Sequence, residues 1–421
     1  MAVILEDVDD LDLTRWIRPG DGLVWGQGCA EPVTLTQRLM SQASELGAIG
    51  AFVGATFAGA VEPEAMPDVR LSSYCASGRN RGWRASGLLD VLPLHYSALA
   101  GLFQRRTIPC DVVLVLLGPA DEHGKYPLAL ADEYLSAALD TARVVIAEVS
   151  SRAPRVPNSR TLAAEDIDVV VQTDREPVEF SAKATAGDGA LAAQVAALVP
   201  DGATLQIGLG SFPGAVLDCL SEHNDLGVHS GLITDGVAEL VRRGVITNAA
   251  KKRDDGLTVT GVAMGSRSLF DWMDGNRSVA LRDTRYTHAP EVLGSLHRFT
   301  AINSALEVDL TGQVNTEVAG GRYIGAVGGV LDFLRGAARS VGGLPIVALP
   351  AAKGGRGRIV AALSGPATVG RADVGVVVTE FGAADLRGLS LPARREALIS
   401  IADPAHRAEL AASAPPEPGP A

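Results

Sequence analysis

Runs of valine, isoleucine and leucine that do not alternate with polar residues constrain the fold of this chain most. These runs span residues 111–118, 142–149, 167–173, 344–349 and 373–382. A strand that is apolar on both faces is typical of a parallel sheet covered by helices on both sides. Because amphipathic stretches over 132–142 and 188–199 lie between the runs, the pattern predicts an α/β fold.

A weak internal repeat suggests how this fold is divided. Residues 19–39 and 200–220 both read Asp-Gly, apolar strand, Gly-x-Gly, Pro and helix. Either the two turns are alike by chance, or the chain contains two similar open α/β domains. We predict two domains because 421 residues are enough for two cores and periodicity is lost near 176–187. The predicted domains are residues 1–182 and 183–410, followed by a disordered tail over residues 411–421.

Composition narrows the classes of function. The formal charge of −12 argues against nucleic acid or an anionic membrane as the main partner, and no apolar stretch is long enough to cross a bilayer. The acidic N-terminus lacks the positive region of a secretory signal. The cysteines form no CxxC pair, which favours a reduced cytoplasmic protein with buried thiols, and the histidines lack metal-ligand spacing, so no metal site is expected.

Two glycine-rich stretches have the properties of ligand sites. In 206–217, glycines let the backbone approach a ligand, and the following helix offers free N–H groups, although a tight structural turn explains the motif equally well. In 325–343, the backbone N–H groups of Gly328 and Gly329 can hold an oxyanion, or the glycines form a packing turn.

Polar residues interrupt the predicted strand within 301–317, which places several of them inside an apolar fold. Buried polar groups need partners, so this segment indicates either an internal hydrogen-bond network or a ligand site. The residues concerned are Asn303, Glu307, Asp309, Gln313 and Asn315.

The segment 225–240 carries His229, Ser230 and Gly231 in a row, in what we predict to be a buried turn before a helix. The triplet is open to three interpretations: a working site, a plain loop, or the remains of a site.

Five stretches in order give the chain a family resemblance. They are DGATLQIGLGSFPGAVL, DLGVHSGLITDGVAELVRRGVITNAAK, INSALEVDLTGQVNTE, GAVGGVLDFLRGAARSVGG and VVVTEFGAADLRGLSLPARREALISIADPAHR. With them, the chain resembles the acetyl-CoA hydrolase/transferase family, which includes 4-hydroxybutyrate and succinyl-CoA:acetate CoA-transferases. The resemblance runs from about residue 20 to about residue 410 and is densest after residue 200.

The resemblance implies two open α/β domains of the CoA-transferase type, with the active site in an interdomain cleft. It also implies homodimers, a CoA thioester as substrate, a small acceptor or water as second substrate, and no bound metal or prosthetic group. By position, Gly329 would supply an oxyanion N–H, and Lys353 and Arg356 would meet the CoA phosphates. The residues expected along the thioester arm are Gln206, Ile207, Gly208, Leu209, Gly210, Gly325 and Gly328.

The chain departs from the family pattern where the family has its nucleophile. Family members use the glutamate of a His-Thr-Glu or Tyr-Thr-Glu triplet before Asp-Gly to form an acyl anhydride and then a glutamyl-CoA thioester. Here the matching triplet ends in Gly231, and His288 stands where the family has an asparagine. Glu307 and Glu317 match carboxylates that accompany the family nucleophile, so we expect them to be supporting groups.

Three interpretations of the altered site remain open. In the first, His288, with a pKa suited to neutral pH, is the general base for acyl-CoA hydrolysis or for acyl transfer to an amine or alcohol, and Gly329 holds the oxyanion. A variant of it makes Ser230 the nucleophile, with His229 or His288 as base. In the second, the chain binds CoA esters without catalysis or is an inactive subunit. In the third, an acceptor carboxylate attacks the thioester directly in a ternary complex.

Overall fold

The computed structural model describes residues 2–182 and 187–413, which group by proximity into two compact units. The first unit contains the chain up to residue 181 together with 230–238 and 257–287, and the second contains the rest. The predicted boundary at 182/183 coincides with the first change of unit to within one residue. Since two later segments also group with the first unit, the domain bounds 1–182 and 183–410 stay a prediction.

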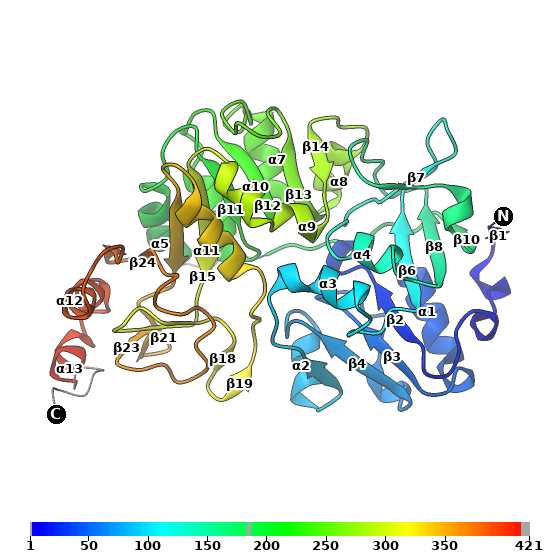
Figure 1. Ribbon diagram of the computed structural model, residues 1–421, viewed down its shortest axis with the longest axis horizontal. Coiled ribbons are helices and arrows are strands. Elements are labelled where there is room, and N and C mark those ends of the chain that lie inside the picture. The colour runs from blue at the N-terminus through cyan, green and yellow to red at the C-terminus, as the bar shows by residue number, and fades with distance from the viewer. Residues whose placement is uncertain (1, 183–186, 414–421) are drawn as a thin grey trace. The chain divides into compact units, whose positions relative to one another are not determined.

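The first unit is built on one parallel sheet of eight strands, in the order β1, β10, β8, β6, β2, β3, β4, β5 (Figure 1). Every neighbouring pair is parallel. The strands are β1 Val3–Leu5, β2 Gly22–Trp25, β3 Ile49–Phe52, β4 Val69–Ser73, β5 Leu89–Val91, β6 Val112–Leu117, β8 Val144–Ser150 and β10 Val169–Thr173.

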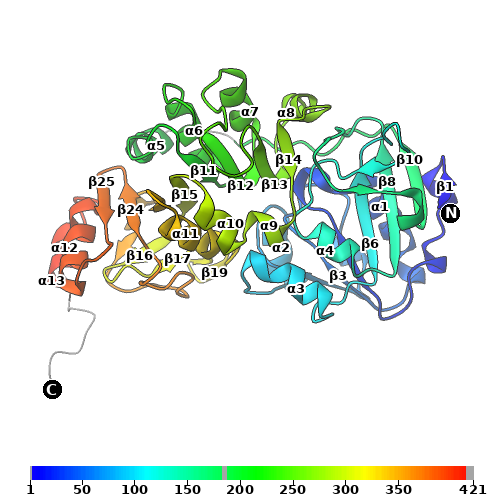
Figure 2. The ribbon, with the colours of Figure 1, turned by 45° about the horizontal axis from the view of Figure 1, so that its top comes forward.

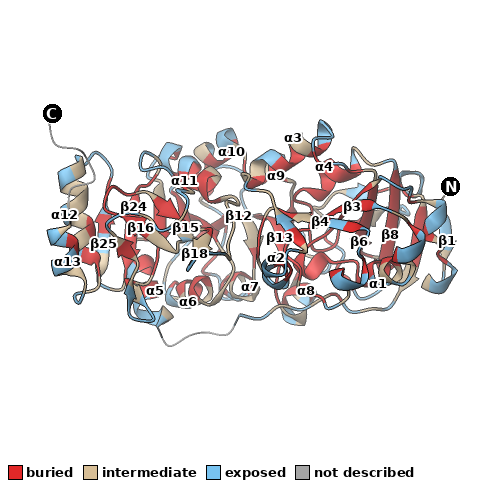
Figure 3. Ribbon diagram, turned by 90° about the horizontal axis from the view of Figure 1, so that it is seen from below, coloured by how far each residue is buried: buried red, intermediate tan, exposed pale blue. Residues whose placement is uncertain are grey.

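The core of this unit explains the non-alternating apolar runs. All residues of β6 and β8 are buried, as Figure 3 shows by their colour. The side chains of Leu23, Trp25 and Leu114 pack into one apolar cluster with helix α1. Helices α1 to α4 accompany the sheet; they are α1 Val33–Gln42, α2 Asn80–Ala85, α3 Leu99–Gln104 and α4 Leu135–Leu139. The predicted parallel α/β architecture is confirmed.

The later segments of the first unit attach to the chain around Glu133. Strand β13 (Thr258–Ala263) pairs in parallel with β14 (Val279–Leu281), and single bridges join Ala131 to Val262 and Glu133 to Asp283. Helices α8 (Arg267–Met273) and α9 (Thr284–Thr287) follow these strands, and the short strands β7 (Tyr126–Pro127) and β9 (Thr161–Leu162) pair with each other.

In the second unit, strands pair in the order β12, β11, β15, β20, β24, β25, and only the last pair is antiparallel. Figure 2 shows helices α5 and α6 beside β11, and α11 packs on β15 and β20. The elements are α5 Asp188–Ala196, β11 Thr204–Ile207, α6 Ser211–Cys219, β12 Gly227–Ile233, α7 Asp235–Arg242, α10 Pro290–Ser295, β15 Phe299–Ser304, α11 Val330–Arg339, β20 Leu344–Ala348, β24 Val376–Thr379, β25 Gly382–Asp385, α12 Leu391–Ile401 and α13 Arg407–Ala412. Of these, β12 and α7 belong only in part to the second unit, because residues 230–238 group with the first.

Seven short strands complete the second unit. They form a three-stranded sheet and two hairpins. Their bounds are β16 Glu307–Asp309, β17 Val314–Asn315, β18 Val318–Ala319, β19 Arg322–Tyr323, β21 Ala352–Lys353, β22 Arg356–Gly357 and β23 Ile359–Val360.

Four local predictions are wrong in detail. The single strand predicted over 373–382 is two strands, β24 and β25, that fold back on each other. The helix predicted over 132–142 is only Leu135–Leu139. Residues 411 and 412, predicted as disordered tail, belong to α13, whereas 414–421 lie outside the described residues. Of the cysteines, predicted to be buried thiols, Cys219 is exposed.

Two absences apply to the described residues alone. No helix among them has the length and apolarity needed to cross a bilayer, and they contain no group of three or more ligand side chains that could hold a metal ion.

Candidate active site

His288 and Gly329 are in contact in the second unit. His288 directly follows α9, is 3% exposed, and its ring centroid lies 4.5 Å from that of Phe333 on α11. Gly329 is the residue before α11, and a Cβ placed on it would lie 2.7 Å from His288 Nε2. Only a glycine therefore fits between the imidazole and the start of the ten-residue helix. The predicted oxyanion N–H and the predicted base thus lie side by side.

The predicted near-neutral pKa of His288 is wrong. Burial of the imidazole lowers its pKa to about 3, because the charged form loses its hydration. The side chain is therefore neutral at physiological pH. A neutral imidazole is a poor general base at that pKa, but it is well suited to donate a hydrogen bond to a developing oxyanion.

The other glycines of 325–329 have different roles. A Cβ on Gly325 would lie 2.0 Å from the carbonyl oxygen of Thr316, and its N–H donates to Glu317 O at 3.1 Å. The need for glycine at 325 is thus explained by packing. Gly328 is half-buried with φ +57, a left-handed conformation that favours glycine.

The predicted cradle 206–210 joins β11 to α6 and is open on one side. Gln206 and Ile207 are buried, and Gln206 Oε1 accepts a hydrogen bond from Asn303 Nδ2 at 3.0 Å. Gly208, Leu209 and Gly210 are half-buried, and Gly210 has φ +127. A Cβ on Gly208 or Gly210 would meet only Pro213, at 3.8 Å in each case. This turn can therefore admit a ligand close to its backbone, beside the free N–H groups of α6.

Residues 229–231 form part of β12, so the predicted turn is wrong. His229 and Ser230 are fully buried, while Gly231 is half-buried. Because successive side chains in a strand point to opposite faces, Ser230 and His229 do not face the same side. The alternation gives no support to a Ser230 nucleophile with His229 as its base.

The polar residues of 301–317 bond mainly to one another and to nearby chain. Asp309 Oδ1 accepts from the N–H and hydroxyl of Thr311, and Glu307 accepts from Ser364 N at 3.0 Å and Ser364 Oγ at 2.7 Å. Glu317 accepts from Tyr323 at 2.9 Å. These contacts are those of the internal network, one of the two alternatives the sequence left open, and they fit a supporting role for both glutamates.

Lys353 and Arg356 face each other across the β21–β22 hairpin, and both are exposed. Two adjacent cations on a free surface suit an anionic ligand, but nothing in the hairpin itself selects CoA phosphates over other anions.

One site was missed by sequence reasoning. In the first unit, Glu133 is buried and Glu133 Oε2 accepts hydrogen bonds from Gln27 Nε2 at 2.6 Å and Tyr96 OH at 2.5 Å. Gln27 Oε1 in turn accepts from Tyr74 OH at 2.8 Å. Burial raises the pKa of Glu133 to about 8 despite these hydrogen bonds. Glu133 lies in the amphipathic stretch 132–142, for which a helix was predicted, so its only signal was the adjacent Asp132-Glu133 pair.

Comparison with known proteins assigns the chain to a protein family. The acetyl-CoA hydrolase/transferase N-terminal domain model matches residues 9–181, and the corresponding C-terminal domain model matches residues 265–414. The chain belongs to the acetyl-CoA hydrolase/transferase family. The resemblance inferred from the sequence motifs is thereby confirmed, and with it membership in a family of acyl-CoA hydrolases and transferases.

Individual members of the family are similar over most of the chain. The 4-hydroxybutyrate coenzyme A transferase of Clostridium kluyveri is 37% identical over 346 residues, which are 81% of each chain. The crystal structure of RipA from Yersinia pestis superposes with a TM-score of 0.88 at 29% identity, covering 97% of this chain and 96% of RipA. The 4-hydroxybutyrate CoA-transferase of Porphyromonas gingivalis gives 0.83 at 30% identity, with the same coverage.

Proposed function

We propose that this protein cleaves acyl-CoA thioesters and passes the acyl group to water or to a non-carboxylate acceptor, without a covalent glutamyl intermediate at residue 231. A glycine has no carboxylate with which to form an anhydride. The observation that carries the proposal is the contact of His288 with Gly329, which joins a neutral imidazole to the start of α11.

This contact can stabilise the tetrahedral intermediate. The first N–H groups of a helix have no partner within the helix, so those at the start of α11 are available to a developing oxyanion. A neutral imidazole adds a second donor without the cost of burying a charge. Loss of one such donor typically lowers kcat by about 100- to 1000-fold.

The turn 206–210 is the proposed site for the thioester arm of CoA. It has three half-buried positions in a row, and only the side chain of Pro213, at 3.8 Å, lies within 4 Å of a Cβ built on Gly208 or Gly210. Binding there needs only backbone N–H groups, so it leaves the acyl group unspecified. The homodimer and the cytoplasmic location stay predictions.

Free thiol released from a panel of acyl-CoAs, with and without amines, alcohols or acetate, tests the proposal. Thiol release in water alone indicates hydrolysis, and release only with an amine or alcohol indicates acyl transfer. His288→Ala is expected to lower kcat by about 100-fold. His123→Ala is the matched control, because the side chain of His123 is 75% exposed on a loop.

Two results would contradict the proposal. The first is turnover that requires a carboxylate acceptor and follows ping-pong kinetics, since this is the behaviour of a glutamyl-CoA enzyme. The second is saturable binding of acyl-CoA with no thiol release under any condition, as expected of a non-catalytic binding protein. A Gly231→Glu variant that gains transfer to acetate would support the register of residue 231 with the family nucleophile.

A further inference from the structure

The carboxyl group of Glu133 is buried, and one of its two oxygens has no hydrogen-bond partner among the described residues. Its side chain is 1% exposed, and Oε2 holds both of its hydrogen bonds, from Gln27 and Tyr96. Among residues 2–182 and 187–413, no group bonds to the buried Oε1. A buried oxygen without a partner destabilises the folded protein, and such oxygens are rare in native structures.

Glu133 lies next to the position where the resemblance places the family nucleophile. Gly261, in β13, separates the two residues. A Cβ built on Gly261 would lie 2.8 Å from the carbonyl oxygen of Gly231 and 3.5 Å from Glu133 Cβ. Gly261 therefore lies close to both residues, so the chain at Glu133 runs near residue 231, where the family's carboxylate is missing.

The backbone of Glu133 is held in a costly conformation. Its φ is +36, in the left-handed region that is unfavourable for a residue with a side chain. The amide of Asp132 donates to Gly261 O at 2.9 Å, and Glu133 O accepts from Thr284 N at 3.1 Å. Strained residues of this kind persist where the surroundings fix them, and they gather at functional sites.

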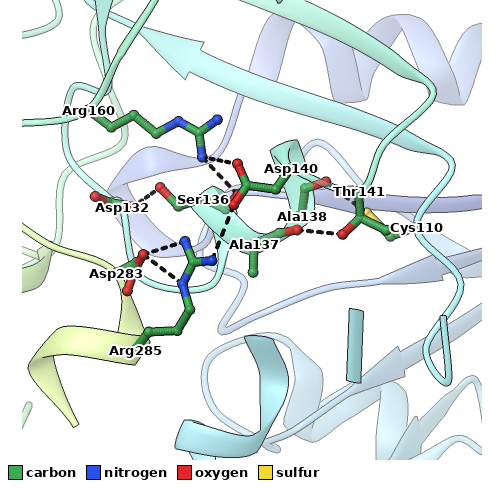
Figure 4. Close-up of polar contacts among 10 residues, drawn as sticks. All are labelled: Cys110, Asp132, Ser136, Ala137, Ala138, Asp140, Thr141, Arg160, Asp283 and Arg285. Atoms are coloured by element: carbon green, nitrogen blue, oxygen red, sulfur yellow. Dashed lines mark hydrogen bonds and ion pairs between the residues drawn. The ribbon is translucent and has the colours of Figure 1, made fainter. Parts of the chain in front are cut away.

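A set of ion pairs lies close to Glu133 in the chain, and Figure 4 shows these pairs around Asp140 and Arg285. Arg285 contacts Asp283 Oδ2 at 2.6 Å and Asp140 Oδ2 at 3.3 Å, and Arg160 contacts Asp140 Oδ1 at 2.7 Å. These pairs tie α9 to the C-terminal end of α4, while Asp132 at the other end of α4 accepts from Ser136. These contacts involve the chain on both sides of Glu133, while the carboxyl group itself is held by Gln27 and Tyr96.

We propose that Glu133 is the catalytic general base of thioester cleavage near Gly231 and that the molecule it deprotonates is water. The chain would then be an acyl-CoA hydrolase. This inference rests on the proposed function. The Glu133 carboxylate takes a proton from a water molecule as the water oxygen bonds to the thioester carbon. The C–S bond then breaks, the thiolate leaves with the electron pair, and Glu133 returns the proton to the sulfur. The products are a free acid and CoA thiol.

The surroundings of Glu133 suit proton transfer near neutral pH. Burial is the main cause of the raised pKa, and hydrogen bonds from Tyr96 and Gln27 oppose it. The ionisable groups that face the carboxyl group are Asp132, Tyr74, Tyr96 and Tyr134. Burial raises the pKa of each tyrosine well above its usual value, so the phenols stay protonated while Glu133 titrates.

Glu133→Gln tests the proposal against Glu148→Gln in the full-length protein. Glu148 is a second buried glutamate of the first unit, but both its oxygens are paired: Oε1 with Thr34 Oγ1 at 2.7 Å and Oε2 with Thr34 N at 2.8 Å. Removal of a general base lowers rates by about 100- to 10,000-fold. We expect Glu133→Gln to lower kcat at least about 100-fold with KM little changed, and folded Glu148→Gln to retain wild-type kcat.

The pH profile and oxygen labelling separate the possible outcomes. Wild-type kcat is expected to rise with pH up to about 8, where Glu133 becomes ionised, and the rise should vanish in Glu133→Gln. In water labelled with oxygen-18, the label should appear in the product acid and not in the Glu133 peptide. Label in that peptide would make Glu133 a nucleophile and overturn the base role.

Different experimental results would refute this inference and the proposed function. If the wild type releases thiol and Glu133→Gln releases it equally fast with an unchanged pH profile, the role of Glu133 is refuted while thioester cleavage stands. If the wild type releases no thiol from any acyl-CoA, both are refuted.

Discussion

The glycine turns of the two units share one local fold and differ in what fills them. In the first unit, β2 leads through Gly26-Gln27-Gly28 to α1, and in the second, β11 leads through Gly208-Leu209-Gly210 to α6. The first turn is buried and closed around the Gln27 amide. The second is half-exposed, with only Pro213 near its glycines.

The difference lies mainly in the middle residue of each turn. Gln27 bonds to Ala55 N, Tyr74, Tyr96 and Glu133, all within 2.9 Å, and so fixes a polar cluster inside the unit. Leu209 offers no polar group to its surroundings, which leaves the backbone as the only polar surface of the second turn. The same turn therefore positions an ionisable group in one unit and leaves room for a ligand in the other.

Gln27→Glu should have the largest effect, because it places a second carboxyl group 2.6 Å from Glu133 where the amide nitrogen now donates. Two buried carboxylates cannot both be charged at that distance. We expect a loss of about 3 kcal/mol in the free energy of unfolding at pH 8. Urea denaturation should show a smaller loss of unfolding free energy at pH 5, where the two carboxyl groups share a proton. An equal loss at both pH values would contradict a charged Glu133.

Glu133→Gln should stabilise the protein in alkaline solution. Burial raises the pKa of Glu133 from 4.5 to about 8. The stability of the folded protein is therefore unaffected by this group below pH 4.5, where it is protonated in both states, and decreases as the pH rises through about 8. The variant cannot ionise and should unfold with a free energy higher by a few kcal/mol at pH 9, on the order expected for such a shift. Calorimetry at pH 5 and pH 9 measures it, and equal stability at pH 9 would rule out the shift.

Leu209→Asp tests the open turn and matches Gln27→Glu in position and charge. Leu209 is half-exposed, so folding should tolerate the carboxylate, with a change in unfolding free energy below about 0.5 kcal/mol. The added negative charge beside the proposed CoA arm should raise KM for acyl-CoA about tenfold, which corresponds to about 1.4 kcal/mol. An unchanged KM would remove this turn from the CoA site.

Tyr96→Phe should give the smallest effect. The substitution deletes the 2.5 Å hydrogen bond from Tyr96 OH to Glu133 Oε2. In the wild type this hydrogen bond lowers the pKa of the Glu133 carboxyl group. Without it the pKa rises further, so the ascending limb of the pH–rate profile should move to higher pH. The loss of rate at pH 7 should be about two- to fivefold and should disappear at pH 10. A rate loss that is independent of pH would assign Tyr96 a merely structural role.

Much of the fold could be predicted from the sequence, because buried parallel strands carry a local signal. The apolar runs became β6, β8, β10 and β20. Positions that depend on tertiary contacts could not be predicted. His229 to Gly231 look like a turn because of the glycine, yet they form the middle of a buried strand whose neighbours pair with it.

Residues of the candidate site were predicted only where they lie within a sequence motif. The glycine turns follow from the glycines themselves, and the pairing of His288 with Gly329 follows from the family resemblance. The pKa of His288 depends on how tightly the ring is enclosed, which no motif encodes. Glu133 escaped detection because its φ of +36 turns a stretch with helical periodicity away from the helix and into the unit.

The central claim is that thioester cleavage proceeds without a carboxylate at residue 231. It is tested most directly by stopping the reaction with an acyl-CoA in mid-turnover and measuring both free thiol and the mass of the protein. The account predicts thiol release in water with the protein mass unchanged throughout. A glutamyl-CoA adduct on any residue, trapped as a mass increase by CoA, would contradict it.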